Sequence, residues 1–292
     1  MATRIGIVGG SGLYEMDGLE DVREQAVETP FGSPSDRYVI GRLPLAGGES
    51  VELVFLPRHG RGHRFNPSEV PYRANIYGMK ALGVGWIISV SAVGSLKEEI
   101  VPGHVVLVDQ FIDRTWKRAS TFFENGIVAH VSFGDPVCAQ LRQLLLQSAK
   151  EVGATAHDGG TYVCMEGPAF STRAESNLHR SWGASVIGMT NMPEAKLARE
   201  AEISYATVAL ATDYDCWHSG HDQVSVDQVI AVLRSNVALA RKIIRQVAPK
   251  IAALDGPPPL AHALKHAIMT DPAVIPPERK QALSLLIGKY LG

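Results

Sequence analysis

The sequence has few cysteines, no excess of one charge and no long apolar run, and each shortage argues against a class of protein. The three cysteines, Cys138, Cys164 and Cys216, are an odd number and lack the spacing of a metal site. They favour free thiols in a reducing cytoplasm over a disulfide framework. The formal net charge of −2 argues against a nucleic-acid partner, because such proteins usually carry a basic surface.

Targeting and membrane-spanning segments are also missing. Arg4 is followed by only a short apolar run into glycines, so we expect no signal peptide, and no stretch is long enough to cross a bilayer. Internal repeats, low-complexity segments and the G-x-S-x-G serine motif are not found either. With 46% hydrophobic and 20% charged residues, the 292-residue chain has the composition of an ordinary globular protein. We expect no metal and no membrane partner.

Apolar segments typical of strands alternate with amphipathic segments typical of helices, which predicts an α/β fold with a central twisted mixed sheet flanked by helices. Residues 109–126 show no period and predict an extended loop. The run Gly256-Pro257-Pro258-Pro259 predicts a boundary between a domain over 1–254 and a tail over 255–292, expected to pack on the domain or on a neighbouring subunit. Strands are expected at 5–8, 37–42, 51–56, 86–91, 105–109, 161–166, 184–189 and 203–210, and helices at about 66–81, 136–152 and 226–249.

Two carboxylates, Asp213 and Asp215, follow the buried strand predicted over 203–210. If strand geometry persists, both point to the same side, at a strand end where α/β proteins bind ligands. Two carboxylates this close repel each other, which raises one pKa and favours a neutral, proton-donating carboxyl. The plain alternative is an acidic turn that caps the next helix, since Asp is common in turns.

Two loops near the N-terminus have features of an anion site. Gly9-Gly10-Ser11-Gly12 follows a short strand, and glycines there let backbone N–H groups face a ligand. Its spacing fits neither G-x-G-x-x-G nor a Walker loop, so a phosphate-sized anion is favoured over a dinucleotide, with a plain tight turn as the alternative. After the strand over 51–56, residues 57–64 hold three arginines and two histidines, among them Arg58 and His59. Arginine forks suit phosphate oxygens, although a solvated basic loop is also compatible.

Further small or aromatic residues follow other predicted strands. Ser91 and Ala92 lie in a small-residue turn, and Thr190 precedes a helix whose N-terminus favours an anion. Phe170, beyond the strand over 161–166, has a ring that stacks on a planar ligand or packs in a core. The residues alone therefore predict an anion site beside a site for a planar, donor-rich ligand.

These motifs together resemble the trimeric purine nucleoside phosphorylases, and within that family the branch that acts on 5'-methylthioadenosine. The resemblance runs from residue 5 to about residue 250 and covers many ordered motifs. The family motifs are 9–12, 57–60, 66–75, 166–170 and 189–194, and the motifs of the branch are Phe111-Ile112-Asp113-Arg114-Thr115 and Ala211-Thr212-Asp213-Tyr214-Asp215-Cys216-Trp217.

The resemblance implies a nucleoside phosphorylase-like single domain and assigns site residues by position. Asp213 is implied as the proton donor to the purine and Asp215 as the reader of its 6-amino group. His130 matches a histidine offered by the adjacent subunit, and His63 lies near the sugar. The implied phosphate set is Ser11, Arg58, His59, Ser91, Ala92 and Thr190. The other implied substrate contacts are the base-stacking Phe170, Ser171 beside it, Met189 against the ribose, and the apolar 5' wall of Val226, Val229 and Ile230.

The implied reaction is attack of inorganic phosphate on the anomeric carbon of methylthioadenosine, with no cofactor or metal. Ser171 stands where relatives that cleave 6-oxopurines carry glutamate, and Asp213 where they carry asparagine, which favours a 6-aminopurine. The alternatives are a 6-oxopurine nucleoside or methylthioinosine phosphorylase, and a nucleoside-binding protein without catalysis. The implied assembly is a homotrimer or a dimer of trimers in the cytoplasm.

Overall fold

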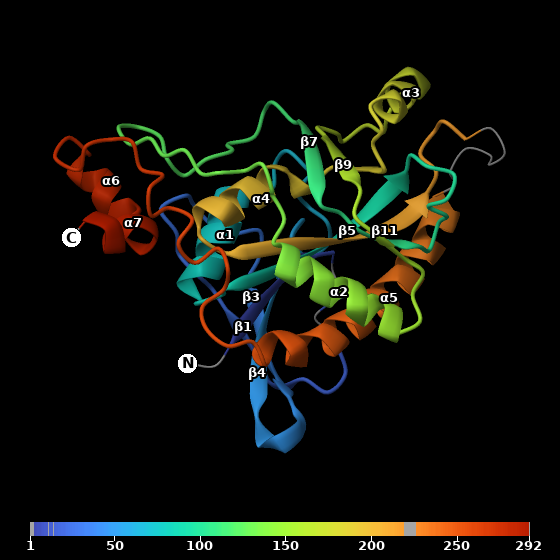
Figure 1. The fold of residues 1–292 in the computed structure, drawn as a ribbon, viewed down its shortest axis with the longest axis horizontal. Coiled ribbons are helices and arrows are strands. Elements are labelled where there is room, and N and C mark those ends of the chain that lie inside the picture. The colour runs from blue at the N-terminus through green and yellow to red at the C-terminus, as the bar shows by residue number, and fades with distance from the viewer. Residues whose placement is uncertain (1–2, 11, 14, 219–225, 292) are drawn as a thin grey trace.

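The computed structural model describes residues 3–10, 12–13, 15–218 and 226–291, without the side chains of 226–231, 233 and 234. Eleven strands in this part of the chain form one mixed sheet with helices on both faces (Figure 1), which confirms the predicted α/β fold. The strands are β1 (Arg4–Gly9), β2 (Glu20–Gln25), β3 (Tyr38–Pro44), β4 (Ser50–Pro57), β5 (Trp86–Ser95), β6 (Val105–Leu107), β7 (Gln110–Arg114), β8 (Ala156–Asp158), β9 (Thr161–Met165), β10 (Val186–Gly188) and β11 (Ser204–Asp213).

Helices cover the sheet in two layers. α1 and α4 pack on each other on one face, and α2 and α5 pack on each other on the opposite face (Figure 1). Alternate residues of β4 show the two faces: Val54 and Leu56 join the apolar cluster with α1 and α4, whereas Leu53 and Phe55 join the cluster with α2 and α5. The helices are α1 (Tyr72–Ala81), α2 (Ala139–Glu151), α3 (Arg173–Ser181), α4 (Asn191–Glu200), α5 (Val226–Ala252), α6 (Pro277–Ala282) and α7 (Ser284–Leu291), with a 3₁₀ turn at Ala46–Gly48.

The sheet branches at β5. This strand pairs in parallel with β11 along most of its length and with β1 over Trp86–Ser89. Its end pairs with β10 in the antiparallel direction, with Gly94 opposite Ile187. β11 is buried from Ser204 to Thr212, as expected for a strand covered on both faces. Because the neighbours of β5 change at its carboxyl end, the strands diverge there, which is where α/β sheets bind ligands.

Several elements differ from the sequence prediction. β7 lies inside the segment expected to be an extended loop, where it pairs in parallel with β9, and β2 and β8 were not expected. The first helix begins at Tyr72 rather than near Asn66, because the Asn66 side chain instead accepts the N–H groups of Ser68 and Glu69 in a local turn. α5 continues through Pro249 to Ala252.

The tail packs against the long segment that follows β7. Ala129 and Ile268 form an isolated antiparallel bridge, and Arg279 Nη2 donates to the carbonyl oxygen of Phe122 at 3.0 Å. Leu283 and Ile287 of the tail are buried in the same apolar cluster as α1 and α4. In this chain, residues 264–291 therefore share their core with the rest of the molecule.

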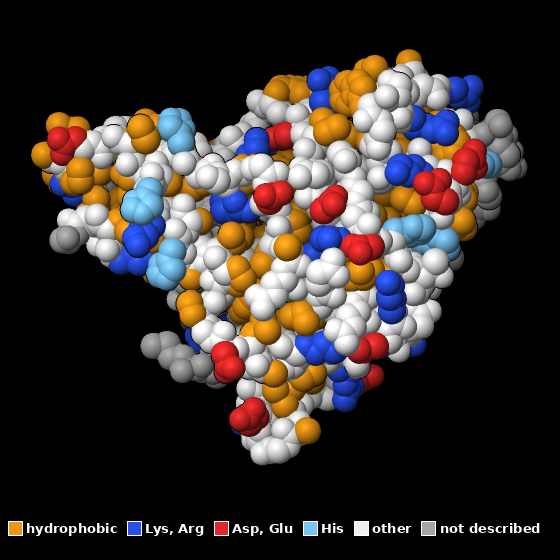
Figure 2. Space-filling model, viewed as in Figure 1, with side chains coloured by type: hydrophobic (Ala, Val, Ile, Leu, Met, Phe, Trp, Pro, Cys, Tyr) orange, Lys and Arg blue, Asp and Glu red, His pale blue; other side chains and the backbone are white. Residues whose placement is uncertain are grey.

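Surface and composition features limit the kinds of site that the described residues form. Within the described ranges, no helix is both long and apolar enough to cross a bilayer, and no group of three or more His, Cys, Asp or Glu residues is arranged to hold a metal. All three cysteines are free thiols. On the face shown in Figure 2, acidic and basic side chains are interspersed, in keeping with the small net charge.

Candidate active site

The carboxyl ends of four strands meet at one edge of the sheet. β4, β1, β5 and β11 are parallel neighbours in that order, with Pro57 opposite Gly9 and Ala209 opposite Ser91. The fold thereby gathers the basic loop after β4, the small residues of β5 and the carboxylates after β11. Ligands of α/β sheets bind at this kind of edge.

The guanidinium of Arg58 is buried and faces Glu194. Its Nε donates to Glu194 Oε2 at 2.7 Å, and its Nη2 donates to Glu194 Oε1 at 3.0 Å and to Ser89 Oγ at 2.7 Å. Nη1 donates to the carbonyl oxygen of Val90 at 3.2 Å. Nη2 also donates to the carbonyl oxygen of Val8 at 3.3 Å, so three acceptors share its two hydrogens. Of the five N–H donors, about one, on Nη1, is therefore left for a ligand. The bidentate contact that the sequence favours for phosphate is made here with Glu194.

His59 and His63 form a stacked pair beside Arg58. Their ring centroids lie 4.3 Å apart with 15° between the planes, and His59 Nδ1 donates to the carbonyl oxygen of Phe65 at 2.9 Å. Burial, with the neighbouring Arg58 charge, lowers the pKa of His59 to about 4. The His59 ring is therefore neutral at neutral pH.

Three hydroxyl groups meet beside the end of β5. Ser91 Oγ lies 3.1 Å from the Tyr162 hydroxyl and 3.3 Å from Thr190 Oγ1. Thr190 is the N-cap residue of α4 but makes no side-chain capping bond, and its hydroxyl turns to β5 instead. Next to Ser91, Ala92 is exposed within an otherwise buried strand. The three hydroxyl groups therefore lie together near the exposed Ala92. The first residues of α4 do not form the free helix N-terminus expected from the sequence, because Met192 is extended and its N–H donates to Cys164 Sγ at 3.3 Å.

The two carboxylates are linked through the turn that follows β11. Asp213 Oδ2 accepts a hydrogen bond from Thr212 Oγ1 at 2.6 Å, and Asp213 Oδ1 accepts one from the Asp215 N–H at 2.7 Å. Strand geometry does not persist to Asp215, because β11 ends at Asp213 and the Asp215 backbone is left-handed, with φ of +51°. Gly94 makes room for the pair, since a Cβ there would lie 3.0 Å from Asp213 Oδ1.

The environment of Asp215 raises the pKa of its carboxyl. Burial is the largest cause and the charge of Asp213 adds to it, whereas the nearby Ser176 and Ser171 hydroxyls act in the opposite direction. Asp215 Oδ2 is buried and has no hydrogen-bond partner among the described residues. The raised pKa expected for one member of the pair therefore falls on Asp215, while both oxygens of Asp213 already accept hydrogen bonds.

The segment after β9 lies beside these carboxylates. The carbonyl oxygen of Ser171 accepts a hydrogen bond from Cys216 Sγ at 3.2 Å, which joins the segment to the turn after β11. Phe170 is 83% exposed, so both faces of its ring are open in this chain. The Met189 side chain packs closely against Gly167: a Cβ at position 167 would lie 2.5 Å from the Met189 sulfur.

Other predicted residues are placed differently or lie outside the described part. His130 lies in the long segment that pairs with the tail, where its N–H donates to the carbonyl oxygen of Ala267 at 2.8 Å. The side chain of His63 is exposed, on a left-handed backbone with φ of +54°. Ser11 and the side chains of Val226, Val229 and Ile230 fall outside the described residues.

Arg118 connects several parts of this site, although the sequence analysis did not single it out. Its Nη1 donates to the carbonyl oxygens of Met189 and Met192, both at 2.6 Å, and its Nη2 donates to that of Glu166 at 2.7 Å. Glu166 Oε2 in turn accepts the Trp116 N–H at 2.7 Å. Arg118 therefore ties the ends of β9 and β10 to the start of α4. The feature of the sequence that could have pointed to Arg118 is its position in a long segment without periodicity, because such segments are often functional.

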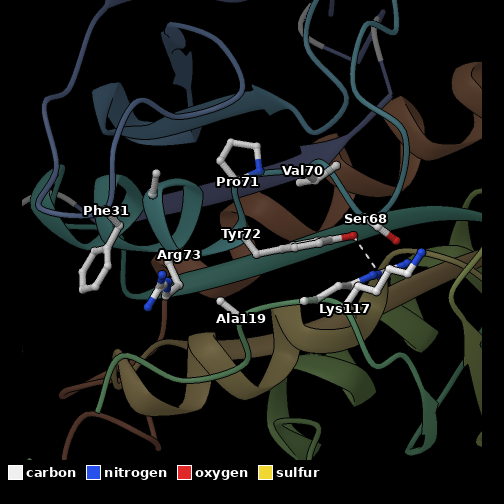
Figure 3. A pocket seen from close by; sticks show the side chains of 10 residues that line it. Phe31, Ser68, Val70, Pro71, Tyr72, Arg73, Lys117 and Ala119 are labelled. Carbon is white, nitrogen blue, oxygen red and sulfur yellow. Dashed lines mark hydrogen bonds between the residues drawn. The ribbon is translucent and has the colours of Figure 1, made fainter. Parts of the chain in front are cut away.

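A small hollow is lined in part by Arg118 and Tyr72. Figure 3 shows Tyr72 across it, with a dashed line for the 3.2 Å hydrogen bond that Arg118 donates to the Tyr72 hydroxyl. Its volume of ≈ 210 Å³ is below the roughly 300–1,000 Å³ of typical small-molecule pockets, and neither Asp213 nor Thr190 lines it. We therefore place the candidate site at the strand ends. The hollow is lined by Phe31, Ser68, Val70, Pro71, Tyr72, Arg73, Ala74, Lys117, Arg118 and Ala119.

A sequence model of the phosphorylase superfamily matches residues 4–249, which span every strand of the sheet. The chain belongs to the phosphorylase superfamily. Within this superfamily, it is 65% identical to the S-methyl-5'-thioadenosine phosphorylase of Geobacter sulfurreducens, over 98% of this chain and 99% of that protein.

Solved structures of this superfamily have the same fold. A methylthioadenosine phosphorylase from an antarctic soil metagenomic library is 49% identical, with a TM-score of 0.92, over 98% of this chain and 99% of that chain. The methylthioadenosine phosphorylase of Schistosoma mansoni in complex with adenine is 40% identical, with a TM-score of 0.80, over 87% and 93% of the two chains. The predicted nucleoside phosphorylase fold is confirmed.

Proposed function

We propose that this protein cleaves the N-glycosidic bond of S-methyl-5'-thioadenosine with inorganic phosphate. A phosphate oxygen bonds to the anomeric carbon as the bond to the purine nitrogen breaks, and the bonding electrons leave with the purine. The products are adenine and 5-methylthioribose 1-phosphate, as in methionine and purine salvage. The observation that carries the proposal is a carboxyl pair beside a hydroxyl pair at one sheet edge, in a chain 65% identical to a phosphorylase named for this substrate.

The phosphate site is proposed at the ends of β1, β4 and β5 and the start of α4. Ser91 and Thr190 supply hydroxyl donors whose oxygens lie 3.3 Å apart. Arg58 supplies positive charge and about one N–H. The proposed phosphate set is that implied by the resemblance: Ser11, Arg58, His59, Ser91, Ala92 and Thr190.

The carboxyl pair is proposed to hold the purine and supply its proton. Adenine is a poor leaving group as an anion, and protonation by a general acid accelerates such a step by roughly 10²–10⁴-fold. We assign the proton transfer at N7 to Asp213 and the contact with the 6-amino group to Asp215. The unpartnered Oδ2 of Asp215 supports the second assignment, because an amino N–H would supply its missing hydrogen bond.

The remaining substrate contacts are proposed from the resemblance. Phe170 stacks on the purine, and its exposed ring leaves both faces available for stacking. Met189 packs against the ribose, and its backbone is held by Arg118. The other proposed contacts are Ser171, His63, Val226, Val229, Ile230 and, from the adjacent subunit, His130.

Two physical effects complete the proposed mechanism. The sugar passes through a state with positive charge, which the bound phosphate dianion stabilises from the opposite side. Holding phosphate and nucleoside in line removes much of the entropic cost of their encounter. We propose that phosphate is a co-substrate, that the reaction uses no cofactor or metal, and that the protein acts in the cytoplasm as a homotrimer or a dimer of trimers.

A panel of three nucleosides tests the proposed substrate. With phosphate present, S-methyl-5'-thioadenosine should be cleaved roughly 10–200-fold more efficiently than adenosine, because the proposed apolar 5' wall favours a methylthio group over a hydroxyl. Methylthioinosine should be cleaved more slowly than either, since two carboxylates accept from an amino group but offer a 6-oxo group few donors. Equal efficiency on methylthioinosine would indicate a 6-oxopurine enzyme. Binding without cleavage of any of the three would indicate a nucleoside-binding protein.

A further inference from the structure

The turn after β11 is attached to the end of β5 through the indole of Trp217. Its Nε1 donates to the carbonyl oxygen of Ser95, the last residue of β5, at 2.8 Å. One position earlier, a Cβ on Gly94 would lie 3.0 Å from Asp213 Oδ1 and 3.2 Å from Asp215 Cβ. The indole and the two carboxyl residues therefore lie against adjacent residues at the end of one strand.

Arg180, in the last turn of α3, stacks on the Trp217 ring. Its guanidinium carbon lies 3.4 Å from the ring centroid, and its Nε donates to the carbonyl oxygen of Leu96 at 3.1 Å. The planar guanidinium suits such stacking, and cation–π attraction favours it. Both members of the pair are thus bonded to backbone carbonyl groups just at the end of β5. The indole also packs against an apolar cluster of Leu96, Val163, Ala184 and Ile187.

The turn is joined to α3 at both ends of the helix. Before the first helical residue, the Ser171 carbonyl oxygen accepts the hydrogen bond from Cys216 Sγ at 3.2 Å, and in the last turn Arg180 stacks on Trp217. One contact alone would let the turn pivot on the helix, whereas two separated contacts fix its orientation. Because Phe170 directly precedes Ser171, the exposed ring and the carboxyl turn belong to one connected unit.

We infer that Arg180 and Trp217 are positioning residues of the purine site, which keep the carboxyl turn aligned with the edge of the base. This inference rests on the proposed function, which stacks the purine on Phe170 and turns its N7 and 6-amino edge to Asp213 and Asp215. The pair acts through the turn and does not touch the reacting atoms. Misplacement of a catalytic group by about 1 Å lowers a rate by roughly 100-fold, so this alignment matters for turnover as well as for recognition.

Calorimetric binding of adenine and hypoxanthine tests the inference, since the two bases differ at the 6-position that the carboxyls are proposed to read. The wild-type protein should bind adenine at least about tenfold more tightly, because a 6-oxo group facing carboxylates leaves acceptors unpaired. Arg180→Ala and Trp217→Ala should reduce this ratio to below about threefold and keep the wild-type affinity for phosphate. A variant that had only lost stability would keep the ratio in its folded fraction.

Conservative variants separate stacking from charge. Arg180→Lys keeps the charge but has no planar group, so its ratio should also fall, and it decides the matter if an alanine variant does not fold. Trp217→Phe keeps an aromatic face for Arg180, so its ratio should lie between those of the wild type and Trp217→Ala. Arg4→Ala is the matched control, because Arg4 donates to the carbonyl oxygen of Leu82 at 2.7 Å but lies at the start of β1. It should keep the wild-type ratio.

Equal affinities for the two bases in the wild type, or an unchanged ratio in the Arg180 and Trp217 variants, would overturn the inference. Because binding involves no turnover, a protein that selects adenine through this pair but cleaves no nucleoside would refute only the proposed function. A protein that releases adenine with phosphate but keeps its ratio in the variants would refute only the role of the pair. In turnover assays, Arg180→Ala should lower kcat by about 10–100-fold and leave the KM for phosphate unchanged.

Discussion

Asp213→Asn is expected to lower the turnover number on S-methyl-5'-thioadenosine by about two to four powers of ten, the range for loss of a general acid. The substitution keeps the shape of the side chain but removes the transferable proton. Its single amide oxygen can keep one of the two accepted hydrogen bonds, from Thr212 Oγ1 or from the Asp215 N–H. Turnover measured at saturating nucleoside and phosphate isolates this step from binding. The resemblance implies asparagine at this position in 6-oxopurine phosphorylases, so we expect the variant to fold.

Asp215→Asn is the matched control for that variant. It should reduce discrimination against methylthioinosine more than it slows the chemistry, because the amide offers a donor to a 6-oxo group. The charge of Asp213 contributes to the raised pKa of Asp215, so the two carboxyls titrate as a coupled pair and a pH profile reports the pair. If Asp213→Asn keeps near-normal turnover while Asp215→Asn loses it, the two roles are reversed.

The raised pKa of Asp215 also predicts the direction of a pH effect. An acid whose folded-state pKa is raised stabilises the protein fully below its unfolded pKa, and this stabilisation is lost as the pH rises through the folded pKa. The protonated pair needed for catalysis is depleted in the same direction, so turnover should fall on the alkaline side of that pKa.

Arg58→Ala is expected to destabilise the fold and to abolish most activity. The side chains of Arg58 and Glu194 are only 3% and 2% exposed, so removing the arginine leaves an uncompensated buried charge. Breaking one partner of such a pair costs about 3–5 kcal/mol in the free energy of unfolding. Glu194 keeps only neutral partners, Ser89 Oγ at 2.7 Å and the Tyr205 hydroxyl at 2.9 Å. Urea denaturation measures the loss.

Replacing both members of the pair separates stability from function. Arg58→Met with Glu194→Leu removes both charges, and exchange of a buried ion pair for apolar residues is often neutral or stabilising. The double variant should therefore recover much of the lost stability but not the affinity for phosphate. An unfolding free energy of Arg58→Ala within about 1 kcal/mol of the wild type would show that Glu194 finds another partner.

Part of the site was predictable from sequence because strand ends can be located from short apolar runs. Thr190 and Asp213 were each placed after a predicted strand, and the sheet brings both to one edge with Ser91. Ser91 was placed at the end of a strand and the start of a turn, but β5 continues through it to Ser95. The partner of Arg58 was not predictable, because Glu194 lies 136 positions further along the chain and only the folded sheet brings them together. The same holds for Arg118, whose acceptors are carbonyl groups that no side-chain pattern reveals.

The errors in the predicted fold have local physical causes. In the part of the chain that the structure describes, β7 pairs with β9 only, at the end of the main strand order. Its five residues are half-buried or exposed and show no apolar–polar alternation that a periodicity search would detect. At the end of β11, the left-handed Asp215 ends the strand period, so the side chain of Asp215 could not be placed by counting from Asp213. At both β7 and the turn at Asp215, the pattern of apolar and polar residues does not indicate the backbone conformation.

The origin of the oxygen on the anomeric carbon tests the central claim of phosphorolysis most directly. S-methyl-5'-thioadenosine is incubated with ¹⁸O-labelled phosphate in unlabelled water, and the sugar product is analysed by mass spectrometry. We expect release of adenine only when phosphate is present, together with 5-methylthioribose 1-phosphate that carries ¹⁸O in the bond to the anomeric carbon. Free methylthioribose with an oxygen from water, formed equally fast without phosphate, would identify a hydrolase and contradict the account.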